Sequence, residues 1–457
     1  MFQVTINKFM QKIILCNIVR SRTLRFCAVL FFAFFIKNSS AQEILKLDDA
    51  LKIALENNYS IQVTRNDAEI ARVNNYAGNA GMMPHINGNV LQDNQNANTY
   101  QKVYTGAERI GTGAVTNQLS ATAELGWTIF DGFKMFATRN KLQELQDIGE
   151  IRMRFQIEQI FTRVIRSYFD VVQNKQLLKV NQESVKLSED RMKLVNDRFA
   201  SGKAAKNEIL NAQVDLNTDR SNMMRQANAL RNSKALLNQI IARDIKTDFD
   251  VPEKIDINNE LKLDSLQFNA RSNNTSVLLA KKNTNVALLG IREIESERYP
   301  YIQLYSGYDY ASQQSPSGFI QSSNSLGYHF GAGLSLNVFN GFSVSKRLQM
   351  AKISLNSNDL VLRDTLSRVE VSVQQSYNTY MMALELLKFE KENVAVAVQN
   401  YELANEQYKV GVISSLDLRT AQQNLLLSQS RLSSVHYEAK LAETDLLRLS
   451  GGLVQLK

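Results

Sequence analysis

The sequence predicts a mainly α-helical chain with a membrane β-barrel portion, and three observations lead to this prediction. The chain holds two copies of one unit, each copy contains two β-strand segments and long antiparallel coiled-coil helices, and no long apolar run follows residue 41. Four strands per chain are too few to close a barrel, and open sheet edges in lipid leave backbone groups unpaired. We therefore expect three chains to form a 12-stranded β-barrel joined to an α-helical barrel.

Residues 1–41 are predicted to be a secretory signal peptide. A basic segment precedes the apolar run Phe26–Ile36, and the small residues Ser39 and Ala41 follow it. The apolar run is too short to cross a membrane. Cleavage after Ala41 removes both cysteines and six of the 53 Lys and Arg residues, so the net charge falls from +8 to +2. Nucleic-acid binding thereby loses its electrostatic support.

The internal repeat is the strongest pattern in the chain. Phe130-Asp131-Gly132-Phe133 matches Phe339-Asn340-Gly341-Phe342 at a spacing of 209 residues, and upstream Pro84 matches Pro300 at a spacing of 216. A constant spacing over long segments is what helices packed in register require. The chain is therefore divided into repeat 1 at residues 42–243, a linker or equatorial region at 244–262, repeat 2 at 263–450 and a short tail at 451–457.

Each repeat is predicted to run helix, strand, loop, strand, very long helix, tight turn and helix. Apolar or aromatic residues at steps of three and four mark a coiled-coil stripe on the long helix, as at Ile157, Ile160, Val164 and Tyr168. A helix of that length measures roughly 95 Å, far more than a globular core needs. The predicted strands are about 85–104, 117–130, 301–312 and 326–339, the long helices 134–197 and 343–407, and the returning helices 207–242 and 416–450.

The second strand of each repeat shows the clearest alternation of apolar with polar or small residues. Such alternation also fits a half-buried strand of a soluble sheet, and on the strands alone this alternative stays open. The strand lengths and the aromatic residues at the strand ends favour a membrane barrel, and no apolar run predicts a transmembrane helix after residue 41. The predicted membrane-interface aromatics are Trp127, Phe130, Phe133, Phe339 and Phe342.

These features resemble the TolC-type outer membrane efflux protein family from about residue 44 to about residue 450. The segment Leu47–Asn58 is similar to the family's opening helix, and Phe130-Asp131-Gly132 is similar to its strand-to-helix motif. The most specific match is Tyr408–Gln422, which resembles the family's tip motif and is repeated more loosely at residues 199–213. The resemblance implies a homotrimer, with a periplasmic adaptor (membrane fusion) protein and an inner-membrane pump of the RND or ABC type docked at its helical tip.

The resemblance implies an outer-membrane exit duct of a tripartite efflux or type I secretion system, which passively conducts cargo to the exterior. The duct would contact outer-membrane lipid, extend into the periplasm and need no cofactor, metal or catalytic residue. The alternative is a periplasmic coiled-coil scaffold or adaptor without channel activity, which would need no alternating strands. An enzyme is disfavoured because His85, His329 and His436 are scattered and show no metal-ligand spacing.

The resemblance also implies a gate, because the family's helical barrel closes like an iris at its periplasmic end. Carried over by position, Tyr408 and Glu208 would form one closing bond, and Asp417 in three copies would make an acidic ring at the entrance that favours cations. Both acids also suit the N-terminus of a helix, and that alternative explains them without a gate. Ile413 stands where some members have an arginine tether, and Thr420 where they have a second acid, which predicts a looser gate and a weaker cation filter.

The turns at the helical tip are predicted adaptor contacts. Glycine suits the left-handed conformation that ends a helix, and small residues let a partner hairpin approach closely. Tight packing at a turn explains the same residues equally well. The predicted contact set is Ala200, Ser201, Gly202, Val410, Gly411 and Val412.

Overall fold

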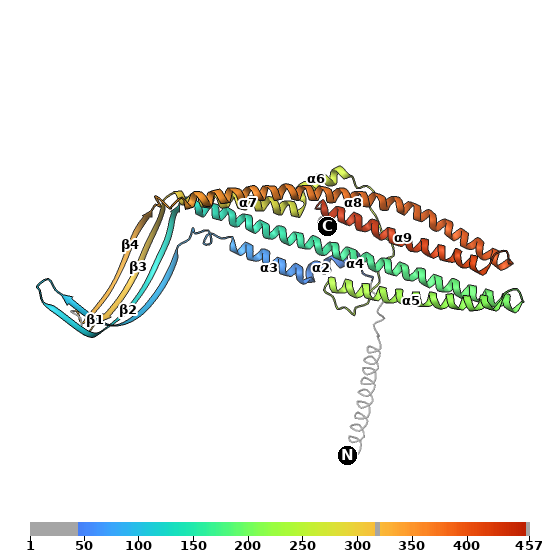
Figure 1. The fold of residues 1–457 in the computed structure, drawn as a ribbon, viewed down its shortest axis with the longest axis horizontal. Coiled ribbons are helices and arrows are strands. Elements are labelled where there is room, and N and C mark those ends of the chain that lie inside the picture. The colour runs from blue at the N-terminus through green and yellow to red at the C-terminus, as the bar shows by residue number, and fades with distance from the viewer. Residues whose placement is uncertain (1–43, 316–319, 454–457) are drawn as a thin grey trace, which may run out of the picture.

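The computed structural model describes residues 44–315 and 320–453. The predicted signal peptide lies outside these residues, as does the end of the predicted tail. The described chain is elongated, with a sheet at one end and two helical hairpins whose turns lie close together at the other (Figure 1). No helix among the described residues is both long and apolar enough to cross a membrane.

Two units with the same order of elements build the chain. The first contains α2 (Leu47–Asn57), α3 (Tyr59–Asn74), β1 (His85–Lys102), β2 (Glu108–Asp131), α4 (Lys134–Ala200) and α5 (Lys206–Ile240). The second contains α6 (Leu263–Asn273), α7 (Thr275–Glu295), the short η1 (Ser296–Arg298), β3 (Tyr301–Gln314), β4 (Ser322–Ser335), α8 (Ser343–Val410) and α9 (Ser415–Leu449). The long helices α4 and α8 have 67 and 68 residues. Each is therefore about 100 Å long.

Each unit opens with two helices where one was predicted, and an asparagine makes the break. Asn58 and Asn274 lie 216 residues apart at equivalent places, and the side-chain oxygen of each accepts hydrogen bonds from two backbone N–H groups of the following helix. The Nδ2 of Asn58 donates to the Ile240 carbonyl at 2.7 Å, and the Nδ2 of Asn274 donates to the Leu449 carbonyl at 3.0 Å. Each asparagine thus ends one helix, caps the next and ties both to the last helix of its unit.

The strands form one antiparallel sheet in the order β1-β2-β3-β4, and two predicted boundaries were wrong. β2 begins at Glu108, opposite Lys102, rather than at 117. Residues 108–116 continue the ladder with β1 because ladder hydrogen bonds join backbone groups and do not require alternating apolar side chains. β4 ends at Ser335, opposite Tyr301, rather than at 339, because β3 begins at Tyr301 and offers no further partner.

The remaining predicted boundaries differ by a few residues. β1 ends two residues before the predicted 104, and β3 ends two residues after the predicted 312. The long helices α4 and α8 run three residues past 197 and 407, because each continues until its glycine turn. Helix ends are the least sharply defined part of a helix, so these differences leave the architecture unchanged.

The two faces of the sheet differ in character. On one face, apolar side chains stand exposed side by side across paired strands, among them Tyr308 opposite Tyr328 and Tyr310 opposite Leu326. The other face carries the row Asn87, Glu124, Gly307 and His329. Within the described residues, the outer edges of β1 and β4 have no partner strand. The sheet therefore presents an apolar face and two unpaired edges, which are sites for pairing with another chain.

The repeated Phe-x-Gly-Phe motif turns the chain from strand to long helix. Gly132 and Phe133 both adopt left-handed backbone conformations, with φ of 69° and 71°, and Gly341 and Phe342 do the same at 61° and 63°. A bulky residue rarely adopts this conformation. The rings of Phe130 and Phe133 meet edge to face with centroids 5.1 Å apart, and Phe339 and Phe342 repeat the contact at 5.5 Å. Such contacts stabilise by about 0.5–1.5 kcal/mol, which offsets part of the strain.

The segment between the two units packs around the middle of α4. Phe249 and Val251 are fully buried there, and Lys175 Nζ donates to Asp250 Oδ2 at 2.9 Å and to the Val251 carbonyl at 2.8 Å. Leu453 joins the same apolar core from the C-terminal end. The segment between the units and the C-terminal tail therefore both stabilise the helical part of the chain at its middle, well away from the hairpin turns.

We expect Asn58→Ala and Asn274→Ala each to lower the free energy of unfolding by about 1–2 kcal/mol, because each change removes a helix cap. Each also leaves a buried carbonyl without its side-chain donor. Chemical denaturation in detergent, followed by circular dichroism, measures the loss. Asn57→Ala is the control, since Asn57 is exposed and next to the cap. An equal loss in the control would contradict the capping role.

Candidate functional site

The four long helices meet in a small apolar core at the tip, remote from the sheet. Val195, Ala212, Tyr408 and Leu418, one from each helix, are buried together there. Both hairpin turns are built alike: Gly202 and Gly411 have φ of 72° and 84°. In each turn the N–H after the glycine returns to a carbonyl of the preceding helix, at 2.8 Å and 2.9 Å. The repeated glycines thus set two equivalent turns side by side.

The structure brings the predicted gate residues Tyr408 and Glu208 together across the two hairpins. Tyr408 lies in the last turn of α8 and is 1% exposed, and its Oη donates to Glu208 Oε2 in the first turn of α5 at 3.2 Å. Burial and then the Glu208 charge raise the pKa of Tyr408 above its ordinary value. The tyrosine therefore stays a protonated donor at physiological pH.

Arg198, which the sequence analysis did not select, holds the same tyrosine from the end of α4. One guanidinium nitrogen donates to the Tyr408 carbonyl at 2.6 Å and another to the Lys203 carbonyl at 3.3 Å. The guanidinium also lies 4.5 Å from the centre of the Tyr408 ring, a cation–π contact. Ile413 stands where some family members have a tethering arginine, and here its side chain packs against the tip core. A cation from the opposite hairpin therefore occupies the neighbourhood of the tyrosine.

Asp417 lies in the first turn of α9 as part of a capping box. Its Oδ2 accepts hydrogen bonds from the Ser414 hydroxyl at 2.7 Å and the Ser414 N–H at 2.9 Å, and its own N–H donates to Ser414 Oγ at 3.2 Å. The Ser414 hydroxyl and N–H lower the pKa of Asp417, which keeps it ionised. The Thr420 hydroxyl donates to the Leu416 carbonyl at 3.0 Å. The helix-start interpretation of Asp417 thus has a full geometric basis, and its place in an acidic ring stays a prediction.

All six predicted adaptor-contact residues are exposed at the two turns. Val410 and Val412 stand out among them, with side chains 76% and 71% exposed. Two branched apolar side chains beside a turn are available for contact with another protein. Their role as adaptor contacts stays a prediction.

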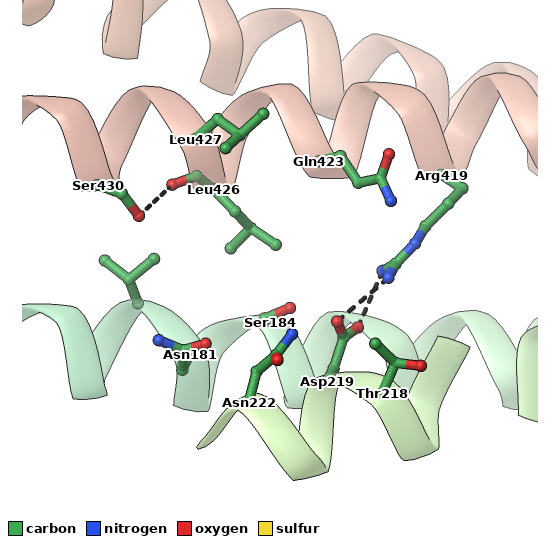
Figure 2. Close-up of a pocket in the computed structure, with 11 residues that line it drawn as sticks. Asn181, Ser184, Thr218, Asp219, Asn222, Arg419, Gln423, Leu426, Leu427 and Ser430 are labelled. Atoms are coloured by element: carbon green, nitrogen blue, oxygen red, sulfur yellow. Dashed lines mark hydrogen bonds and ion pairs between the residues drawn. The ribbon is translucent and has the colours of Figure 1, made fainter. Parts of the chain in front are cut away.

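A buried polar cluster joins α9 to the α4–α5 hairpin a short way from the tip (Figure 2). Arg419 points from α9 toward Asp219 of α5, and the guanidinium donates to both carboxylate oxygens at 2.9 Å and 3.1 Å. The two side chains are 10% and 6% exposed. Ser188 of α4 donates to Asp219 and accepts from Gln422 of α9 at 2.9 Å. We call Arg419, Asp219, Ser188 and Gln422 the clamp cluster.

A second carboxylate, that of Asp215, lies close to the guanidinium of the clamp cluster. Asp215 pairs with Arg191 within the first hairpin and lies 3.6 Å from Arg419 Nε. The repeat offers a signal for Arg419, because the residue 209 positions earlier is Leu210. The same spacing places Ser428 at the position equivalent to Asp219, but the contact of Asp219 with Arg419 exists only once the helices pack. Sequence reasoning therefore missed this buried ion pair between the hairpins.

The comparisons with known proteins agree with this architecture. The outer membrane efflux protein family matches residues 50–243 and 267–452. The outer membrane protein TolC of Escherichia coli (strain K12) is 23% identical over 381 residues, covering 77% of this chain and 75% of TolC. The fold is similar to a membrane protein from Pseudomonas aeruginosa, with a TM-score of 0.74 at 17% identity, covering 90% of this chain and 92% of that one. The CmeC outer membrane channel of Campylobacter jejuni gives 0.73 at 15% identity, covering 89% and 85%.

An apolar-faced sheet continued by two coiled-coil hairpins is the architecture of an outer-membrane channel subunit. Because the family match spans both units, the chain belongs to the outer membrane efflux protein family. It is an outer-membrane protein that extends into the periplasm and functions in efflux. The resemblance inferred from the tip and strand-to-helix motifs is confirmed. The periplasmic scaffold loses its support, because the matched relatives are outer-membrane proteins.

Arg419→Leu should lower the free energy of unfolding by about 3–5 kcal/mol, because it leaves the buried Asp219 carboxylate without its cation. Arg419→Leu with Asp219→Leu should recover most of that loss, since no unpaired charge remains. Urea unfolding in detergent of the two single variants and the double variant forms a cycle that isolates the pair. Additive losses in the double variant would show that the two side chains are not coupled.

Proposed function

We propose that three copies of this chain form one continuous duct, with a β-barrel in the outer membrane and an α-helical barrel through the periplasm. The observation that carries the proposal is a four-stranded sheet with an apolar face and two unpaired edges. In lipid each unpaired backbone group costs several kcal/mol, so the edges of β1 and β4 must find partners. Three sheets joined edge to edge give twelve strands, a number that outer-membrane barrels use.

The exposed apolar residues of the helices support the same assembly. Leu210, Val214 and Val396 are 59%, 64% and 65% exposed on α5 and α8, the outward sides of the two hairpins. Apolar patches of this kind mark contact surfaces. In a ring of three chains, α8 of one chain would lie against α5 of the next and cover these residues. The hairpins would then enclose a passage continuous with the barrel.

The aromatic residues at the strand-to-helix junctions fit the membrane surface. Phe133, Phe339 and Phe342 are 60%, 73% and 67% exposed. Trp127 is 39% exposed, and its Nε1 donates to the Met82 carbonyl at 3.1 Å. Aromatic side chains with one apolar side favour the boundary between hydrocarbon and water. We place the periplasmic face of the outer membrane at this belt.

The tip is the gate and entrance of the proposed duct. The bond from Tyr408 to Glu208 holds the end of α8 against the first hairpin, and Arg198 strengthens it. Three copies of Asp417 at one entrance would attract cations and repel anions. A periplasmic adaptor would bind the exposed turns, and an inner-membrane pump of the RND or ABC type would supply the driving force. The duct itself would confine cargo passively.

Reconstitution of the purified mature chain tests the duct. Brief chemical cross-linking in detergent should give a trimer, and addition to a planar lipid bilayer should give discrete conductance steps. Heated and unheated samples of the protein should migrate differently on a gel, since membrane barrels stay folded in detergent until they are heated. A water-soluble single chain that never produces conductance would overturn the proposal and return the scaffold as the better interpretation.

Replacing the gate pair by Tyr408→Phe with Glu208→Gln should raise single-channel conductance severalfold, because the hydrogen bond that holds α8 inward is lost. Planar-bilayer recording measures the change. Tyr401→Phe is the matched control: it removes a hydroxyl from a partly buried tyrosine of the same helix and the same tip core. Unchanged conductance in the double variant would remove the gate role of this pair.

A further inference from the structure

A pocket of about 590 Å³ lies where α4 leaves the sheet and α7 approaches it. Its volume is within the range of about 300–1,000 Å³ that is typical of small-molecule sites. One wall comes from the Phe-x-Gly-Phe junction and the first turns of α4, and the other from the end of α7 and from η1. We call it the junction pocket, and its aromatic and charged lining residues are Phe133, Phe136, Tyr299, Arg292, Glu295 and Arg298.

The aromatic part of the junction pocket is an exposed apolar surface. Phe133, Phe136 and Tyr299 are each more than half exposed. The ring of Phe133 lies between the other two, with centroids 6.3 Å from Phe136 and 6.4 Å from Tyr299. Exposed rings that gather in this way mark a contact surface for an apolar ligand.

The charged part of the junction pocket holds ionic groups without partners. Arg292 and Glu295 lie in the last turn of α7, and Arg298 ends η1, so the three follow at steps of three residues. That spacing permits ion pairs along a helix. In the part of the chain that the structure describes, however, none of these three side chains makes an ion pair or a hydrogen bond. Two guanidinium groups and one carboxylate are therefore available to a ligand.

A neighbouring arginine shows the contrast. Arg347, in the first turn of α8, donates through two nitrogens to the carboxylate of Glu297, which lies in η1 beside Arg298. The chain thus neutralises one arginine at this end of the helices and leaves Arg292 and Arg298 unpaired. Their planar fork of donors matches the oxygens of a phosphate group.

The junction pocket opens on the apolar side of the sheet. The ring of Phe133 meets that of Phe130, and Phe130 pairs with Ile302 of β3. Ile302 shares its face with Tyr308 and Tyr310, because side chains two residues apart along a strand point the same way. The pocket therefore faces the side that we assign to lipid, at the level of the aromatic belt.

The pocket stays open in a ring of three chains. It lies between α4, which follows β2, and α7, which precedes β3, and these are the two middle strands of the sheet. Closure of the barrel uses the outer edges of β1 and β4 instead. Neighbouring chains therefore leave the junction pocket uncovered.

We propose that the junction pocket binds a phospholipid of the periplasmic leaflet whose head group carries a phosphate and a primary amine. Arg292 and Arg298 donate to the phosphate oxygens, and Glu295 accepts from the ammonium group. Phe133 and its two aromatic neighbours contact the first carbons of the acyl chains. This proposal rests on the membrane position given above, and Glu295 distinguishes the ligand from a purely anionic one, which this carboxylate would repel.

The internal repeat predicts one such site per chain. At the spacing of 216 residues, the positions equivalent to Arg292, Glu295 and Arg298 hold Tyr76, Asn79 and Met82. In a ring, that equivalent junction lies between α8 of one chain and α3 of the next. It has no arginine to hold a phosphate. We therefore expect three lipid sites in a trimer rather than six.

A tryptophan placed in the pocket tests the proposal, since Trp127 is the only tryptophan of the chain. The variant Trp127→Phe with Phe136→Trp is reconstituted in phosphatidylcholine vesicles that contain increasing fractions of phosphatidylethanolamine brominated on its acyl chains. Bromine quenches a nearby tryptophan, so quenching above the lipid fraction measures preference. We expect a severalfold preference for phosphatidylethanolamine, because exposed charge pairs each contribute little. Quenching in proportion to the lipid fraction would overturn the proposal.

Further variants in this background separate the pocket from general attraction. Arg292→Ala with Arg298→Ala should abolish the preference, and Glu295→Gln should remove the advantage of phosphatidylethanolamine over phosphatidylcholine. The matched control is Lys134→Ala with Lys346→Ala, which removes two exposed cations from the same end of the helices but outside the pocket. The control should keep the preference. An equal loss in the control would show that any nearby cation attracts head groups, and would overturn the site.

Two competitors identify the ligand. Brominated phosphatidylglycerol has the phosphate without the amine, so it should be preferred less than phosphatidylethanolamine. Inorganic phosphate at millimolar concentration should leave the quenching unchanged. A stronger preference for phosphatidylglycerol would overturn the amine-bearing head group, and release of the lipid by inorganic phosphate would show a site for a soluble anion instead.

Native mass spectrometry of the unmodified trimer counts the sites. Up to three phosphatidylethanolamine molecules should stay bound, and the Arg292→Ala with Arg298→Ala protein should retain none. Six in the unmodified trimer would overturn the assignment to the arginines. Absence of quenching by every brominated lipid would reject the membrane position itself, whereas conducting trimers without lipid preference would reject the pocket and leave the duct standing.

Discussion

The unpaired edges of the four-stranded sheet are the constraint on which the rest of the structure depends. β1 and β4 end the sheet with open rows of N–H and C=O groups, and one face is covered with exposed apolar side chains such as Tyr328 and Phe330. Water can satisfy such edges, and hydrocarbon cannot. A chain of this family therefore has to close its sheet with other copies, and the long helices that continue from the strands then form one tube.

Internal repetition lets the chain build its part of that tube from the same structural elements used twice. The same left-handed Phe-x-Gly-Phe junction turns strand into helix twice, and the same asparagine cap opens each unit. In the proposed ring of three chains, repeated packing would give nearly equivalent contacts within and between subunits. The equivalence fails at the clamp cluster. Arg419 and Asp219 form a buried ion pair within the chain, whereas the positions equivalent to them in the repeat hold Leu210 and Ser428.

The tip illustrates how one residue serves local structure and a proposed gate together. Asp417 completes a capping box with Ser414, and Glu208 stands in the first turn of its helix. Capping accounts fully for the position of Asp417, whereas Glu208 also accepts a bond from a tyrosine on the other hairpin. Helix starts place acids at the turns, and the packing of the two hairpins decides which acid becomes a contact between them.

The sequence by itself determined the repeat, the long helices and the strand-to-helix motif, because these depend on periodicity and on residue spacing within a unit. The pairing candidates Tyr408 and Glu208 came from the resemblance to the family, which carried them over by position. The start of β2 at Glu108 and the end of β4 at Ser335 depended on which backbone groups found partners. Arg198 and the Arg419–Asp219 pair emerged only from the tertiary structure. Residues about 200 positions apart become neighbours through helix packing, and a single charged residue in a coiled-coil sequence does not reveal the partner it will meet.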